Sequence, residues 1–221
     1  MTFQDRNEAA ARLAEALSRY CDAHPLVLAI PRGGVPMGKI LADRLGGELD
    51  VVLVRKLGAP FDREMAVGAV DESGWVYVTP YAARVGADSG YLNQERDEQL
   101  ALLRRRREQY TPGRSARALD GRTVIVVDDG LATGATMIAA LHAVRQQHPA
   151  LLVCAVPVAA PASLAEVRRY ADEVVCLRSP ANFSAVGEHY REFPQVEDEE
   201  VVACLEGDSG QHGEGRLAGR E

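Results

Sequence analysis

Five short apolar runs constrain the fold of this chain more than any other feature of its sequence. They are LVLAI (26–30), DVVLVRK (50–56), VIVV (124–127), LLVCAVPV (151–158) and EVVCL (173–177). Such runs are too short for core helices and rich in β-branched residues, so they predict buried strands. Near-continuous apolar strands that alternate with helices are typical of a parallel sheet covered on both faces. We therefore expect an α/β fold with a doubly wound parallel sheet.

Helical spacing of apolar residues predicts the segments that cover this sheet. These segments lie at about 5–20, 39–45, 89–110, 135–147 and 163–171. Two apolar runs around Gly74, within residues 65–78, predict a hairpin that extends from the main sheet. A chain of 221 residues is long enough for one well-packed domain, which we expect over residues 1–205. The polar, Gly-rich tail 206–221 is expected to be disordered.

Charge and cysteine usage argue against several classes of protein. The net charge of −7 and the pI near 5.3 argue against a nucleic-acid-coating protein and favour small-molecule partners. The four cysteines lie far apart without a CxxC pair, so they are interpreted as reduced thiols rather than zinc ligands. No secretion signal and no apolar run of membrane-spanning length is present. We expect a soluble, cytoplasmic protein that does not enter a membrane.

The strand at 124–127 ends on two adjacent carboxylates, Asp128 and Asp129, and continues into the loop GLATGAT (130–136). Helix capping would explain one carboxylate and leave the other, with both loop glycines, unexplained. Ligands of doubly wound sheets bind at the carboxyl ends of strands, where this loop lies. Its glycines allow close approach, its N–H groups can converge on one phosphate, and its threonines add hydroxyl donors.

Carboxylates beside a phosphate would repel it, unless the ligand also carries hydroxyl groups that donate to them. Ribose 5-phosphate has this shape. Three competing motifs do not match the sequence. Ala135 stands where a P-loop has its lysine, and Gly130 stands where a dehalogenase-type site has its second acid. The acidic residues also precede the glycines, whereas in a Rossmann fingerprint they follow them. The sequence therefore predicts a ribose-phosphate site. Its expected contacts are Asp128, Asp129, Gly130, Leu131, Ala132, Thr133, Gly134, Ala135 and Thr136.

VIVVDDGLATGATM resembles the phosphoribosyl pyrophosphate (PRPP) binding motif of type I phosphoribosyltransferases. The resemblance extends over residues 8–205 through AIPRGGVPMG, RKLGAP, EMAVGAV and AVGEHYREFPQV, which characterise a bacterial group of phosphoribosyltransferases without a defined acceptor. It implies a type I fold with a small C-terminal hood. It also implies transfer of the 5-phosphoribosyl group from PRPP to a nitrogenous base or related small acceptor, as in nucleotide salvage, with release of pyrophosphate.

The diphosphate of PRPP requires a second anion site, and the loop IPRGGVPMG after the first strand is the candidate. Gly33 and Gly34 expose N–H groups beside Arg32, which can pair with two phosphate oxygens. The resemblance implies catalytic roles for Asp128, Asp129 and Arg32. It also implies a diphosphate contact for Lys56, and Mg²⁺ held mainly by oxygens of PRPP, so no protein metal site is expected.

Several assignments stay open at the level of sequence. Ala132 stands where hypoxanthine-guanine enzymes carry an acceptor-contacting Asp, which argues against that activity. Aromatic residues of segment 178–196 could stack on an acceptor or belong to the core; they are Phe183, Tyr190 and Phe193. Arg55 and Glu64 are candidates of the same kind, for the diphosphate and for a base or metal-bound water.

The arginine run 104–107 is interpreted as a solvated helix face, although some of its members could reach an anionic ligand. The alternative function is a non-catalytic regulator that binds PRPP or a nucleotide, and that acts on RNA in some relatives. The low basicity of the chain argues against the RNA version. A homodimer is compatible with the sequence.

Overall fold

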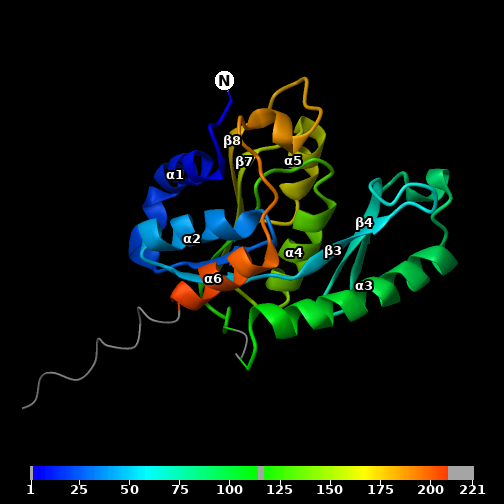
Figure 1. Cartoon of the computed structure of the whole chain (residues 1–221), viewed down its shortest axis with the longest axis horizontal. Helices are drawn as coiled ribbons and strands as arrows, with labels where there is room; N and C mark the ends of the chain where they lie inside the picture. The colour runs from blue at the N-terminus through cyan, green and yellow to red at the C-terminus, as the bar shows by residue number, and fades with distance from the viewer. Residues whose placement is uncertain (1, 114–116, 209–221) are drawn as a thin grey trace, which may run out of the picture.

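The computed structural model describes residues 2–113 and 117–208. Its central sheet has five strands in the order β2-β1-β6-β7-β8, and every neighbouring pair is parallel. The strands are β1 (Leu26–Ala29), β2 (Glu48–Val51), β6 (Thr123–Val127), β7 (Leu151–Val158) and β8 (Glu173–Arg178). Figure 1 shows α1 (Arg6–Ala16) and α2 (Gly34–Leu45) on one side of this sheet, with α4 (Ala135–Arg145) and α5 (Pro161–Val167) on the other. The predicted doubly wound α/β fold is confirmed.

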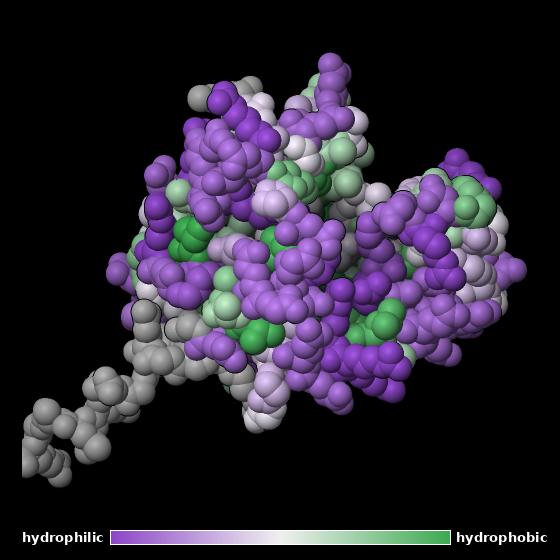
Figure 2. Space-filling model, in the orientation of Figure 1, coloured by the Kyte–Doolittle hydropathy of each residue, from purple (hydrophilic) through white to green (hydrophobic). Residues whose placement is uncertain are grey.

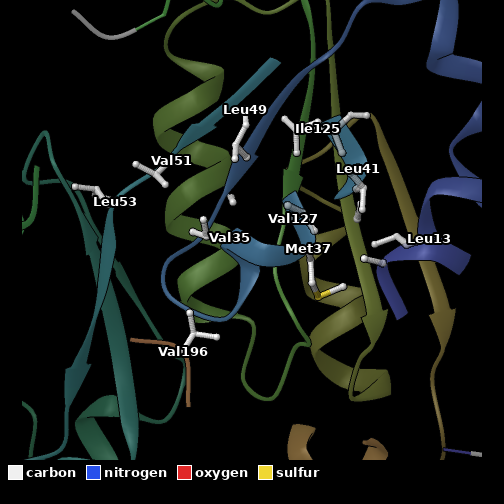
Figure 3. Close-up of a cluster of buried hydrophobic side chains, with 14 of the residues drawn as sticks. Leu13, Val35, Met37, Leu41, Leu49, Val51, Leu53, Ile125, Val127 and Val196 are labelled. Carbon is white, nitrogen blue, oxygen red and sulfur yellow. The ribbon is translucent and has the colours of Figure 1, made fainter. Parts of the chain in front are cut away.

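The sheet is buried on both faces because successive side chains of each strand point to opposite sides. In β6, Ile125 and Val127 belong to the apolar cluster that includes α1 and α2, whereas Val124 and Val126 belong to the cluster around α4. Figure 3 shows Met37 and Leu41 of α2 in the first of these clusters, together with Ile125 and Val127. The apolar runs of the sequence are therefore explained by two cores, one on each face.

The expected strand 50–56 is divided in the structure. Strand β2 ends at Val51, where its partner β1 also ends, and β3 (Val54–Gly58) enters a separate antiparallel sheet with β4 (Ala66–Asp71) and β5 (Val76–Val78). A strand loses its ladder of hydrogen bonds where its neighbour stops, so the chain turns away there. The β4–β5 hairpin is confirmed, but it belongs to this second sheet and does not extend the main one.

Helix α3 (Ser89–Tyr110) packs against the second sheet and spans the predicted segment 89–110. We call β3, β4, β5 and α3 the arm, and Figure 1 shows it projecting from the body of the molecule. Short 3₁₀ helices occupy Ser18–Ala23, Ala82–Val85 and Val186–His189. None of the helices in the described part of the chain is both long and apolar enough to cross a membrane.

Helix α6 (Asp198–Asp208) was not predicted from the sequence. It places Val201 and Leu205 in the core one helical turn apart, and acidic residues fill its first turn, which suits the helix dipole. Helix α6 runs past residue 205, and the division into a domain over 1–205 and a tail over 206–221 stays a prediction. Residues 206–208 end α6, and the rest of the expected tail, 209–221, lies outside the described residues.

The strand order creates a crevice between β1 and β6. Strand β1 leads into α2 on one face of the sheet and β6 leads into α4 on the other, so the two loops diverge at the carboxyl edge. Gly34 begins α2 very close to the neighbouring strand: a Cβ there would lie 2.8 Å from Val127 O and 3.2 Å from Asp128 Cα. The absence of a side chain at Gly34 sets how closely the two loops approach.

Gly34→Ala should therefore lower the free energy of unfolding by ~1–3 kcal/mol, because a backbone contact cannot be relieved by a rotamer change. Gly90→Ala is the matched control: a Cβ there lies 3.4 Å from Asp88 Oδ1, inside α3. It should be neutral or stabilising by ~0.5 kcal/mol, since alanine is the better helix former. Urea unfolding of both variants measures the difference, and equal stabilities would contradict the close-approach argument.

Candidate active site

A cavity of about 640 Å³ lies at the carboxyl ends of β1 and β6 and extends to the arm. Figure 2 shows the surface hollowed between the body and the arm. The predicted ribose-phosphate and diphosphate contacts line this cavity except Gly34 and Ala135, which are buried at the starts of α2 and α4. Residues from five separate segments of the sequence, 30–33, 54–66, 95–106, 128–137 and Val186, therefore meet at the crevice of the parallel sheet.

In the loop after β6, backbone hydrogen bonds hold Leu131, while the N–H groups of residues 132–134 are available to a ligand. Leu131 donates its N–H to Val158 O and accepts from Ala160 N, both at 2.9 Å, so this N–H is unavailable to a ligand. The expected unbroken run of converging N–H groups is thus interrupted. Within the described residues, none accepts a hydrogen bond from the N–H groups of Ala132, Thr133 or Gly134. Gly134 has φ 75°, a conformation that favours glycine, and it starts α4.

The two aspartates have different surroundings. Asp128 Oδ1 accepts the Asp129 N–H at 2.8 Å, whereas Asp129 Oδ2 accepts from Arg6 Nε at 2.9 Å and lies 2.8 Å from Arg6 Nη2. Burial raises the pKa of Asp128, and the neighbouring Asp129 raises it further. Burial also raises the pKa of Asp129, but the charge of Arg6 offsets part of the shift. Asp129 is therefore held in place by an ion pair, and Asp128 keeps its carboxylate available on the cavity wall.

Arg6 is a site residue that sequence reasoning missed. Its side chain is 11% exposed, it donates to Pro194 O at 2.6 Å, and its guanidinium carbon lies 3.8 Å from the Phe193 ring centroid. A signal was present, because a cation at the first position of a helix opposes the helix dipole. Its cost is offset here by the Asp129 carboxylate, which draws the N-terminus of α1 to the site.

The aromatic residues of segment 178–196 lie outside the cavity lining, and Val186 is the member of this segment that lines it. Tyr190 is buried, donates its hydroxyl to Asp129 O at 2.6 Å and stacks on Phe193 with ring centroids 4.8 Å apart. Phe183 stacks on His189 at 5.2 Å. Tyr190 therefore belongs to the core, whereas Phe183 is partly buried and Phe193 is 36% exposed. Through its hydrogen bond to Asp129 O, Tyr190 holds the backbone of that residue in place.

The arm supplies charged groups to the opposite wall of the cavity. Arg55 and Lys56 lie on the antiparallel strand β3, not at the end of a parallel strand as expected, and Glu64 follows in the β3–β4 loop. In the loop after β1 the Pro31–Arg32 peptide bond is cis. Arg32 Nη1 lies 3.1 Å from Glu197 Oε2 of the segment before α6. Over the described ranges, no group of three or more His, Cys, Asp or Glu side chains is arranged to hold a metal ion.

The half-buried acidic pair predicts a pH-dependent cost to stability. The folded-state pKa of Asp128 is raised, so the folded protein binds more protons than the unfolded chain and its stability falls as pH rises above the ordinary carboxyl pKa of ~4. Asp128→Asn keeps an Oδ1 acceptor for the Asp129 N–H and removes the charge. We expect it to unfold at a higher temperature than wild type at pH 7, with a gain that shrinks towards pH 4. A constant difference across this range would contradict the burial argument.

Breaking the Arg6–Asp129 pair should be costly, because it leaves a buried carboxylate without its counter-ion. We expect Arg6→Ala to lose ~3 kcal/mol of unfolding free energy. Arg12→Ala is the control on the same helix, where the partner is Glu8 and both side chains are far more exposed. It should lose less than ~1 kcal/mol. If denaturant unfolding gave equal losses of unfolding free energy for both variants, the Arg6–Asp129 pair would stabilise the fold no more than the exposed pair does.

Comparisons with known proteins agree with this geometry. A family described as the phosphoribosyl transferase domain matches residues 3–192. Proteins from two Mycobacterium tuberculosis strains, CDC 1551 and H37Rv, each provisionally named a phosphoribosyl transferase, are 42% identical over 205 residues, which are 92% of this chain and 46% of each relative. The chain thus spans about half the length of these relatives.

A crystal structure of the protein TT1426 from Thermus thermophilus is 50% identical and superposes with a TM-score of 0.79. The match covers 94% of this chain and 99% of that one. The family match extends from the N-terminus of α1 to the segment that carries Tyr190, so it includes both loops of the crevice and the arm. The chain belongs to the phosphoribosyl transferase family.

Proposed function

We propose that this chain transfers the 5-phosphoribosyl group of PRPP to a small nitrogenous acceptor and releases pyrophosphate. One observation carries the proposal: a half-buried carboxylate, Asp128, and the open N–H groups of Ala132, Thr133 and Gly134 line the same cavity as the cations of the arm. A ligand with hydroxyl groups next to one phosphate, and a second anionic group farther away, matches this distribution of charge.

The sugar-phosphate end of the donor is assigned to the loop after β6. The 5-phosphate accepts from the N–H groups of Ala132 to Gly134 and from the hydroxyls of Thr133 and Thr136, at the N-terminus of α4, where the helix dipole favours an anion. The ribose hydroxyls donate to Asp128. Asp129 contributes negative charge through a carboxylate that Arg6 already holds in one orientation.

The diphosphate end is assigned to Arg32, Gly33 and Lys56, which line the other side of the cavity. In the reaction, the anomeric C–O bond breaks and its electron pair leaves with pyrophosphate, while the lone pair of the acceptor nitrogen forms the new C–N bond. The cationic groups stabilise the departing diphosphate, and Asp128 stabilises the positive charge that develops on the ribose. Mg²⁺ would be held mainly by oxygens of PRPP and by water. The carboxylates of Asp128 and Glu64 line the same cavity and would contribute negative charge near the ion.

The acceptor is assigned to the wall formed by Leu131, Ala132 and Val186, because a nucleophile approaches the anomeric carbon from the face opposite the leaving group. This wall is apolar, and a Cβ at Gly130 would lie 2.7 Å from Val186 Cγ1, so the segment after β8 packs directly on the loop. No carboxylate stands at position 132. A purine held by an acidic side chain there is therefore not part of the proposal. We propose a cytoplasmic location, and the homodimer stays a prediction.

A second candidate function is a non-catalytic sensor of PRPP or a nucleotide. The Arg32–Glu197 contact favours it, because this ion pair engages the guanidinium that the diphosphate requires. Glu197 is 60% exposed, however, so the pair is weak and an anionic ligand can displace it. Recognition of RNA through the arginine run loses support, because Arg106 faces the cavity and Arg107 pairs with Glu72.

Donor binding is tested by heat stability in the presence of Mg²⁺ and PRPP. Ligand at a hundred times its dissociation constant should stabilise the wild-type chain by ~2.7 kcal/mol. Asp128→Asn should lose most of this gain while the unliganded protein stays folded. The single substitution is preferable to replacing both acids, because Asp129→Asn would also leave Arg6 unpaired. Asp120→Asn, an exposed change beyond the other end of β6, is the control.

Transfer itself is tested by screening bases and small amines for PRPP-dependent release of pyrophosphate. Release with at least one acceptor, and its loss in Asp128→Asn, would support the transferase. Donor binding without release in the presence of any acceptor would favour the sensor. A donor response that is identical in wild type and Asp128→Asn would remove the ribose assignment.

A further inference from the structure

Arg55 is held in the cavity wall by a neutral side chain. Its Nε donates to Gln99 Oε1 at 2.5 Å, and Gln99 Nε2 donates to Glu95 Oε1 at 3.0 Å. Glu95 and Gln99 are both more than nine-tenths buried, and the other carboxylate oxygen of Glu95 pairs with Arg63. The amide thus orients Arg55 without neutralising it, and the nearest buried carboxylate already has its own cation.

Arg106 brings a second guanidinium to the same place from α3. Both arginines line the cavity, and no carboxylate in the described part of the chain forms an ion pair with Arg106. Burial lowers the pKa of Arg55, and the positive charge of Arg106 lowers it further. The charge of Glu95, which already pairs with Arg63, offsets part of this shift. The two half-buried guanidinium groups repel each other, so an anion that bridges them would remove this cost.

Arg32 stands near this pair. The charges of Arg106 and of Arg32 both act on the hydroxyl of Tyr110, which burial and a hydrogen bond to Asp198 shift to a pKa of about 12. Arg32 Nη1 also lies 4.0 Å from Oδ1 of the same Asp198, and the three guanidinium groups from the β1 loop, β3 and α3 line one cavity. Three cations in one cavity suit the anionic leaving group and not a neutral acceptor.

We propose that Arg55 and Arg106 form an anion-binding subsite that holds the distal phosphate of a diphosphate, while Arg32 and the N–H groups at Gly33 hold the proximal one. The inference rests on the proposed function and identifies Arg106 as the member of the arginine run 104–107 that reaches the anionic ligand, whereas the pattern of the run as a whole indicates a solvated helix face. Planar guanidinium groups suit this task, because each can donate two parallel hydrogen bonds to phosphate oxygens. Free pyrophosphate has the same chemistry as the diphosphate of the donor and serves as the probe.

The test is calorimetric titration of the full chain with magnesium pyrophosphate, which needs no acceptor. Arg106→Gln should weaken binding roughly tenfold to hundredfold, since it removes a charge-assisted contact. Arg105→Gln is the matched control: it makes the same charge change one residue away on an exposed position of the same helix. It should leave the affinity within about twofold, with the small change expected from a distant charge screened by salt.

Two further variants separate a direct contact from general charge. Arg106→Lys should recover part of the affinity, and Gln99→Glu, which places a carboxylate on Arg55, should reduce it. Equal losses in Arg106→Gln and Arg105→Gln, or no loss in Arg106→Gln, would overturn the inference, as would a wild-type chain that does not bind pyrophosphate. Failure of the proposed function would give a different result. Pyrophosphate would still bind in a way that depends on Arg106, but no acceptor would cause the release of pyrophosphate from PRPP.

Discussion

The close approach of the loop after β1 to the acidic pair after β6 is the constraint on which the site depends. A Cβ at Gly33 would lie 2.0 Å from Asp129 Oδ2, so with a larger residue there the Asp129 carboxylate could not keep its place beside Arg6. Because the two loops leave the sheet on opposite faces, their contact point is also the floor of the cavity. Packing of backbone against carboxylate therefore fixes the distance between the sugar side and the diphosphate side of the proposed site.

Burying two neighbouring carboxylates is unfavourable, and the surrounding structure offsets it unequally. Arg6 neutralises Asp129, and the Tyr190 hydroxyl satisfies the carbonyl of the same residue, whereas Asp128 receives little more than the Asp129 N–H. The remaining cost is concentrated on one group at the cavity wall, which is where a ligand with hydroxyl donors can offset it. The charge of Asp128 thus lowers the stability of the fold while it serves the proposed function. The charge of Asp129, which is paired with Arg6, serves both.

The sequence predicted those parts of the molecule that local pattern determines. The apolar runs gave the parallel strands, and the acidic pair with its Gly- and Thr-rich loop gave one half of the cavity, because both signals lie within a few residues. Contacts between distant segments were not predictable in this way: Arg6 meets Asp129 and Phe193 across the whole length of the chain. The division of segment 50–56 was missed for a related reason, since Val52 and Leu53 are as apolar as any strand residue and only the end of β1 terminates the pairing.

The arm contributes to the site because it is anchored to the body. Trp75 at the hairpin stacks on His142 of α4 with ring centroids 3.6 Å apart, and His142 Nδ1 lies 3.5 Å from the fully buried carboxylate of Asp71 on β4. The same carboxylate accepts from Ser73 and Trp75, which closes the turn. These contacts place the cations of β3 and α3 opposite the loops of the sheet before any ligand is bound. In the transfer reaction proposed above, a charge that is already oriented would stabilise a departing diphosphate without the reorganisation that solvent would need, so the anchor on α4 would serve the electrostatics of the site as well as the fold.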